Sequence, residues 1–209
     1  MPMPLTSPSD VAFTPAVKAI QTLRGSRDAY AGPEADAAWR TEIDDNLAAF
    51  LAAQTSIFLA TASADGQPTI QHRGGPPGFL HVLDTTTLAF ANFAGNRQFI
   101  TLGNLSENSK AHIFVLDYVH RQRVKIWGEA RAIEDDPALL KAVMPRGYRA
   151  RPEQVILFKV TAWNTNCRQH IPQKFDAADV KAALELRETR IAELEGEVAA
   201  LRGTPLPAP

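Results

Sequence analysis

Two basic residues followed by two glycines form the first segment of this sequence that could bind a ligand. Residues 67–77 read Gln-Pro-Thr-Ile-Gln-His-Arg-Gly-Gly-Pro-Pro, so a strand-like run ends at His72 and Arg73 and continues into Gly74 and Gly75. Arginine offers a fork of N–H donors to a phosphate, and glycines let the backbone approach the same anion. The segment indicates either a phosphate-binding strand end or an ordinary Gly-Pro turn after an exposed basic pair.

A second segment combines a glycine turn with the start of a helix. Residues 90–105 read Phe-Ala-Asn-Phe-Ala-Gly-Asn-Arg-Gln-Phe-Ile-Thr-Leu-Gly-Asn-Leu, which predicts a strand, a turn at Gly95 and a helix with Arg97 in its first turn. A helix N-terminus exposes unpaired N–H groups at the positive end of its dipole. An anion beside Asn96 and Arg97 would therefore meet backbone and side-chain donors together, unless Asn96 serves only as the helix cap. Neither segment has the parallel strand-helix-strand context of a P-loop or a dinucleotide fingerprint.

Little else points to catalysis by the protein's own side chains. No two histidines show the His-x-x-x-His spacing of a helical metal site, so no metal is expected; they are His72, His81, His112, His120 and His170. The single cysteine, Cys167, excludes an intrachain disulfide and a multi-cysteine zinc cluster. No Ser-His-Asp arrangement can be argued. Redox or transfer chemistry should therefore belong to a bound cofactor.

The composition limits the partners of the chain. Its 209 residues are 45% hydrophobic, enough for one domain with embellishments. Lys and Arg total 22 against 23 Asp and Glu, so the net charge of -1 gives no bulk attraction for nucleic acid or an acidic membrane. The N-terminus lacks the layout of a signal peptide, and the apolar runs are far shorter than the ~20 residues that span a bilayer. We expect a cytoplasmic protein without nucleic-acid or membrane partners.

The elements that must position the two segments are mostly strands. Short β-rich runs punctuated by turn residues cover 55–62, 68–73, 79–83, 86–93, 111–118, 122–133 and 155–162. The Asp-Gly pair at 65 and 66 favours an antiparallel hairpin between the first two runs. Helices are expected near 97–105 and from 136 to 143. This order predicts an α+β protein that is mainly β, with an antiparallel barrel or sandwich.

Helices are also expected at both ends of the chain. Thr14-Pro15 and Gly25 bound a short helix, and Trp39, Ile43, Leu47, Phe50 and Leu51 recur at helical spacing. From Asp176, apolar residues recur every seven positions, although Arg187 interrupts the second series. Such a narrow seam needs a partner, either a second copy or the protein's own helices. The domains expected are an N-terminal segment (1–35), the β domain (36–175), a C-terminal amphipathic helix (176–203) and a disordered tail (204–209).

Together, the two glycine-containing segments resemble the pyridoxamine 5'-phosphate oxidase-like family. The resemblance covers roughly residues 40–175 and continues through Asp-Gly-Gln-Pro at 65–68, Arg-Gln-Arg-Val-Lys-Ile-Trp-Gly-Glu-Ala at 121–130 and Trp163. Gly-Asn-Arg at 95–97 with Leu-Gly-Asn at 102–104 looks closest to its uncharacterised flavin-binding branch. The resemblance implies an antiparallel split β-barrel of the FMN-binding type, FMN as cofactor, and a homodimer with the cofactor site at the subunit interface.

The resemblance also implies roles for individual residues. The ribityl-phosphate or the flavin edge would contact Gln71, His72, Arg73, Gly74 and Gly75, and the phosphate would contact Asn96, Arg97 and Gln98. Arg123 falls where the family places a polar flavin contact, and Trp163 where it places an aromatic contact. The chain departs from the biosynthetic oxidases at Pro76, where they carry a lysine, and at Arg168-Gln169-His170, whose spacing to Trp163 is altered. A role in vitamin B6 synthesis is therefore not expected.

Two functions follow from this resemblance. In the first, the protein is an FMN-dependent oxidoreductase in which the flavin accepts hydride or electrons from a reduced nucleotide or a small organic substrate. In the second, it is a non-catalytic dimer that binds flavin, deazaflavin or haem.

Overall fold

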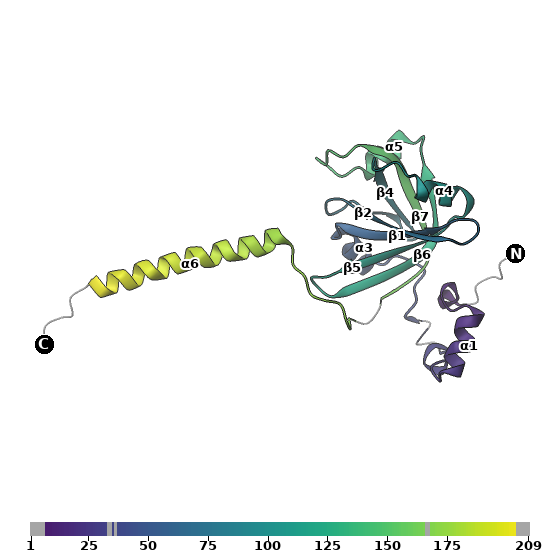
Figure 1. The fold of residues 1–209 in the computed structure, drawn as a ribbon, viewed down its shortest axis with the longest axis horizontal. Coiled ribbons are helices and arrows are strands. Elements are labelled where there is room, and N and C mark those ends of the chain that lie inside the picture. The colour runs from purple at the N-terminus through teal and green to yellow at the C-terminus, as the bar shows by residue number, and fades with distance from the viewer. Residues whose placement is uncertain (1–6, 33–34, 36, 166–167, 204–209) are drawn as a thin grey trace. The chain divides into compact units, whose positions relative to one another are not determined.

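The computed structural model describes residues 7–32, 35, 37–165 and 168–203. Two compact units are present, one of Met1–Asp117 with Gln122–Gln169 and one of Tyr118–Arg121 with His170–Pro209. Cys167 and the expected tail 204–209 lie outside the described residues. The first unit contains the whole sheet (Figure 1).

The sheet has seven antiparallel strands, which confirms the predicted fold class. They are β1 (Ser56–Ala62), β2 (Pro68–Gly74), β3 (His81–Asp84), β4 (Thr87–Phe93), β5 (Lys110–Asp117), β6 (Gln122–Ile133) and β7 (Pro152–Thr165). Their order is β2-β1-β5-β6-β7-β4-β3, so β2 and β3 are the edges and the sheet stays open between them. This is an antiparallel split barrel.

Alternating burial along the strands shows why the sequence folds this way. On β1, Ile57, Leu59 and Thr61 are buried while their neighbours are half-buried, so one face of the strand points into the core. At the hairpin to β2, Gly66 adopts a positive φ of 92° and its N–H donates to the Ser63 carbonyl at 3.0 Å. The Asp-Gly pair thus forms the tight turn that the sequence predicts.

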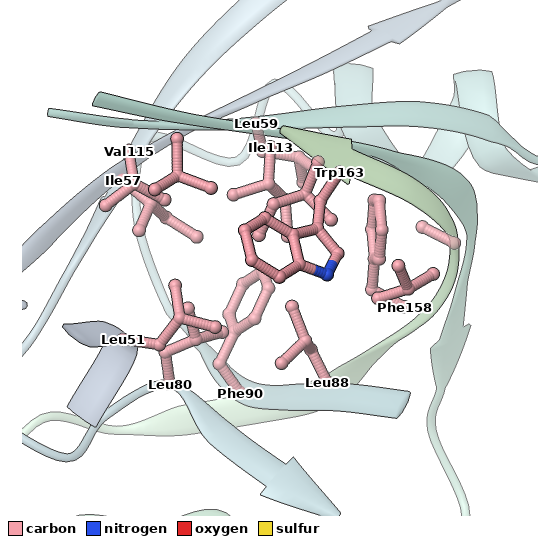
Figure 2. Packing of buried hydrophobic residues seen from close by; sticks show 14 of the residues in the cluster. Leu51, Ile57, Leu59, Leu80, Leu88, Phe90, Ile113, Val115, Phe158 and Trp163 are labelled. Carbon is pink, nitrogen blue, oxygen red and sulfur yellow. The ribbon is translucent and has the colours of Figure 1, made fainter. Parts of the chain in front are cut away.

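The core lies inside the curved sheet (Figure 2). Side chains from β1, β4, β5 and β7 meet there with Leu51 from the helix α3 (Asp45–Ala52), and the Trp163 ring lies among them. A smaller cluster joins the other face of β4 to α5 (Pro137–Val143) through Ala89, Val143 and Val155. Because β4 is covered on both faces, five successive residues from Thr87 to Ala91 are buried.

The predicted helix through Trp39 is the main error in the sequence analysis. Helix α3 begins only at Asp45, where the Asp44 carboxylate caps it by accepting from the Leu47 N–H at 2.8 Å. Arg40 instead pairs with Trp163 of β7 through two backbone hydrogen bonds. The apolar spacing of Trp39 and Ile43 reflects burial of an irregular segment against the sheet, because that segment satisfies its backbone groups by tertiary contacts.

The helix α1 (Pro15–Leu23) begins with Pro15 behind the N-cap Thr14, as predicted, and none of its residues is buried. The second unit consists of the 118–121 turn, the segment from His170 and the helix α6 (Ala177–Gly203). Within it, Arg121 Nε donates to the Ile171 carbonyl at 3.1 Å and Gln173 Nε2 to the Val119 carbonyl at 2.9 Å. Among the helices formed by the described residues, none combines the length and apolar character that a bilayer crossing requires.

The half-buried imidazole of His112 on β5 should make stability depend on pH. It stacks edge-on against Trp127 of β6 with 4.7 Å between ring centroids, beside Lys125. Burial, and secondarily the Lys125 charge, lower the pKa of His112 to about 4 from 6.5. Between pH 6.5 and 4 the unfolded chain therefore binds more protons at His112 than the folded protein does. The free energy of unfolding keeps its full value above pH 6.5 and falls as the pH drops toward 4.

We expect the free energy of unfolding to fall by about 1–2 kcal/mol over that range. This is less than the full pKa shift of His112 would give, because solvent reaches part of the ring. The measurement is urea unfolding between pH 7 and 4.5 for the parent and for His112→Gln, whose side chain does not titrate there. An equal loss in both proteins would mean that His112 does not cause the dependence.

Candidate functional site

The two predicted segments meet at one cavity of about 90 Å³, here called the β2–α4 cavity. It lies between the edge strand β2, the ends of β4 and β7, and the helix α4 (Ile100–Glu107) with the loop before it. Its lining residues are Gln71, Arg73, Asn92, Phe93, Gly95, Asn96, Arg97, Phe99, Ile100, Thr101, Leu102 and Glu153. Four of the residues predicted from sequence are therefore brought together: Gln71, Arg73, Asn96 and Arg97.

The guanidinium of Arg73 is held in place by two hydrogen bonds and keeps its Nε donor available. Its Nη1 donates to the His72 carbonyl and its Nη2 to the Thr101 hydroxyl, both at 2.9 Å. Thr101 in turn donates to Gln71 Oε1 at 3.4 Å. Arg73 Nε is buried and has no hydrogen-bond partner among the described residues. Because burial lowers the pKa of Arg73 by disfavouring its charged form, an anion at this point would stabilise the charge and accept from the free Nε donor.

Thr101 is a site residue that the sequence analysis missed. Its side chain is buried and links α4 to β2 through Arg73 and Gln71, 28 and 30 residues earlier in the chain. Its place in the first turn of a helix beside Arg97 was the available signal, but a hydroxyl there is more often part of a cap.

The strand places His72 on the opposite face from Arg73. His72 is exposed, and its Nε2 shares a hydrogen bond of 2.8 Å with the Ser56 hydroxyl. Alternation along β2 makes this separation unavoidable, since successive side chains point to opposite faces. Contact of His72 with a cofactor stays a prediction, and the β2–α4 cavity does not include it.

The glycine pair serves the packing of the chain itself. A Cβ on Gly75 would stand 2.6 Å from Phe79 Cβ, and one on Gly74 would stand 2.9 Å from the Thr55 carbonyl oxygen. These glycines thus permit a close approach between protein atoms, and neither lines the β2–α4 cavity. Their predicted cofactor contact also stays a prediction.

The loop before α4 differs from the predicted capped helix. Helix α4 begins at Ile100, so Arg97 precedes it, and both Arg97 and Phe99 adopt positive φ values of 59° and 54°. Asn96 does not cap α4: its Oδ1 accepts from the Gln98 N–H at 3.2 Å. The N-cap position, Phe99, makes no side-chain cap, so the first N–H groups of α4 remain available to an anion. Gln98 does not line the cavity.

Non-glycine residues in the left-handed region are uncommon, and two of them so close together indicate a loop held in an unfavourable conformation by its surroundings. The exposed Arg97 side chain rests over the Phe99 ring at 5.8 Å. The loop thereby places the exposed cation of Arg97 in the lining of the same cavity as Arg73.

Arg123 and Trp163 lie at a second cavity, here called the β6–α3 cavity, of about 300 Å³. It is lined by Asn46, Leu47, Phe50, Gln122, Arg123, Val124, Trp163, Thr165 and Arg168, and shares no lining residue with the β2–α4 cavity. Arg123 Nε is buried without a hydrogen-bond partner among the described residues. Trp163 Nε1 donates to the Glu42 carbonyl at 2.8 Å, and the Arg40 guanidinium lies 5.2 Å from the Trp163 ring centroid.

Solved structures with a similar fold come from several bacteria. HupZ of Group A Streptococcus is 18% identical with a TM-score of 0.49, and the match covers 64% of this chain and 100% of that one. A putative pyridoxamine 5'-phosphate oxidase of Lactobacillus delbrueckii is 21% identical (TM-score 0.45, coverage 59% and 94%). HutZ of Vibrio cholerae, described as a haem storage protein, is 15% identical (TM-score 0.38, coverage 56% and 88%). No curated protein sequence matches the chain.

A sequence comparison with protein-family models gives a direct assignment. The family model described as pyridoxamine 5'-phosphate oxidase matches residues 43–167 of the 209, from just before α3 to the end of β7. This range contains both cavities except for Arg168. The resemblance seen in the sequence is thereby confirmed, and the chain belongs to the pyridoxamine 5'-phosphate oxidase family.

Proposed function

We propose that the protein binds FMN and acts as a flavin-dependent oxidoreductase. The observation that carries the proposal is the convergence of Arg73, with its free buried Nε, and Arg97, in the loop before the uncapped start of α4. A guanidinium fork and helix N–H groups are the donors that phosphates prefer in proteins. The cavity of about 90 Å³ is smaller than the ~300–1,000 Å³ of whole-ligand pockets, so it suits a phosphate group and leaves the ring outside.

The flavin ring would then need a second surface, and the β6–α3 cavity offers one. It combines the apolar side chains of Leu47 and Phe50 with the Trp163 ring and the free donor of Arg123. Since the two cavities share no residue, we propose a homodimer in which the phosphate end lies on one subunit and the ring contacts the β6–α3 cavity of the other. Such a dimer should sediment at about twice 22.8 kDa.

FMN, when bound, would supply the hydride or electron transfer. The residues of this chain would hold and orient it: Arg73 fixes the phosphate, Thr101 fixes Arg73, and Trp163 limits where the ring can lie. No residue of the described part of either cavity is a histidine, cysteine, methionine or tyrosine, the usual axial ligands of haem iron. The residues at hand therefore favour flavin over haem.

Cofactor binding and turnover measured with the purified protein test the proposed function. Equilibrium dialysis against FMN, a deazaflavin and haem is expected to show FMN retained with a flavin absorbance spectrum, and the FMN-loaded protein should oxidise a reduced nicotinamide nucleotide. Binding of FMN without turnover with reduced nucleotides or a panel of small reductants would identify a flavin-binding protein without catalysis. Failure to retain FMN would overturn the proposal.

Mixing of two variants tests the shared site. Arg97→Ala and Arg123→Ala homodimers should each bind FMN weakly, whereas a mixed dimer has one site with both substitutions and one with neither. Random subunit exchange makes about half of the dimers mixed, so about a quarter of the sites should regain parental affinity. The measurement is FMN titration after exchange, with the unmixed variants as controls. If exchange occurs without any recovery, both contacts come from one subunit.

A further inference from the structure

Helix α6 carries an apolar seam that no described residue of its own structural unit covers. No residue of its 27 is buried, and Leu184, Ile191 and Leu194 are 54%, 54% and 42% exposed. The seam follows a heptad pattern, with Ala177, Leu184, Ile191 and Val198 at positions a and Val180, Arg187, Leu194 and Leu201 at positions d. This set is called the α6 seam below. At about 1.5 Å per residue the helix extends for roughly 40 Å, nearly four heptads.

The charged residues beside the α6 seam identify its partner. In a parallel two-stranded coiled coil, each g residue lies next to the e residue five positions later on the other helix. This rule brings Arg190 to Glu195 and Glu197 to Arg202 of the second chain, and Asp176, the residue just before α6, to Lys181. All three pairs have opposite charges, and the remaining pair, Ala183 with Glu188, contains no like charges.

Arg187 fits the same arrangement, although it interrupts the apolar seam. At position d it would face the Arg187 of a second copy, which costs stability. The neighbouring g residue is Ala183, whose small side chain leaves room for Arg187 to turn outward toward the partner's Glu188 at position e. A polar residue at one core position weakens a coiled coil but fixes its register, so Arg187 would oppose shifted pairings.

An antiparallel pair agrees less well with the charges. With the helices fully overlapped, it would bring Arg190 next to Arg190 and Glu188 next to Glu188. These repulsions offset its favourable contacts between Lys181 and Glu195. The ion pairs within one helix, such as Arg190 with Glu193 at 2.8 Å, are exposed, so replacing them with ion pairs between the two helices costs little free energy.

We propose that α6 pairs with the α6 of a second copy of this chain as a parallel, in-register, two-stranded coiled coil. The interaction buries the α6 seam and places opposite charges at three of its four g–e pairs. It goes beyond cofactor binding, since the seam contains no donor cluster for a phosphate and lies in a different structural unit from the two cavities.

Disulfide trapping in the full-length protein tests both pairing and direction. In a Cys167→Ser background, Val180→Cys and Leu201→Cys should each cross-link to themselves under mild oxidation, because identical d residues face each other at distances that a disulfide spans. In an antiparallel pair, residue 180 would face residue 198 and two copies of residue 180 would lie roughly 27 Å apart, so only a mixture of Val180→Cys with Val198→Cys would cross-link. Leu186→Cys, 74% exposed and outside the α6 seam, is the matched control.

Self-linking of both seam variants at least tenfold faster than Leu186→Cys supports the proposal. Cross-linking found only in the mixture, or at the rate of the control, overturns it. A charge exchange gives a second measurement: Arg202→Glu should slow cross-linking at position 201 several-fold, and adding Glu197→Arg should restore it. FMN titration of the same variants should stay within a few-fold of the parent, which separates this result from the cofactor proposal.

Discussion

Replacing Arg73 or Arg97 with alanine is expected to weaken FMN binding about ten- to a hundred-fold. Each substitution removes a charge-assisted hydrogen bond to the phosphate, which contributes about 1.5–3 kcal/mol. Arg73 should have the larger effect, because its guanidinium is already fixed by His72 and Thr101 and loses little side-chain entropy on binding. The exposed Arg97 must be immobilised when the ligand binds, so part of its contact energy is lost.

Riboflavin provides the control that links these effects to the phosphate. It has the ring and ribityl chain of FMN without the phosphate, so its weaker binding should change less than two- to three-fold in either variant. Arg131→Ala removes an exposed arginine of β6 outside both cavities and should leave the FMN affinity unchanged. The phosphate assignment is wrong if both alanine variants bind FMN with the parental affinity. It is also wrong if they lose as much affinity for riboflavin as for FMN.

Thr101→Val should reproduce part of the Arg73 effect without changing any charge. The substitution removes the hydroxyl that orients Arg73 Nη2 and keeps the shape of the buried side chain. It supports the geometry described above if FMN binding falls several-fold while riboflavin binding does not.

Gly128→Ala is expected to destabilise the protein by about 3 kcal/mol or more, or to prevent its folding. Gly128 is buried on β6 at an irregularity in the pairing with β7, where the register shifts between Trp127 and Gly128. A Cβ there would overlap the Lys159 carbonyl oxygen and stand 2.5 Å from Phe158 Cε1. The obstacle is backbone and a fully buried ring, which cannot move without disturbing the β6–β7 pairing.

The measurement is urea unfolding followed by tryptophan fluorescence, with the yield of folded protein where the variant fails to accumulate. Gly103→Ala is the matched control, since a Cβ there meets no atom within 4 Å and the residue lies in helix α4. The same chemical change should leave stability unchanged or raise it by up to about 1 kcal/mol. Equal stabilities for the two variants would show that the tight contact at Gly128 relaxes without cost.

The sequence by itself determined the elements whose causes are local. Alternating apolar residues predict the strands, since a period of two can bury only one face, and the Asp-Gly pair at 65 and 66 predicts the first hairpin. The seven-residue spacing after Asp176 predicts α6 within one residue at each end. The resemblance of the two glycine-containing segments to a known family implied that Arg73 and Arg97 lie near one phosphate, and both residues line one cavity.

Only the tertiary structure decided which neighbours of these residues share the site. Trp39 and Ile43 have helical spacing, yet the segment that carries them is not helical, and α3 begins only at Asp45. Arg40 of this segment pairs with β7, and these long-range backbone hydrogen bonds satisfy polar groups that a helix would otherwise satisfy. The pleat of β2 separates His72 from Arg73, and the fold of β6 and β7 places Arg123 and Trp163 in a different cavity. Thr101 joins the site through contacts 28 and 30 residues apart, which no local pattern encodes.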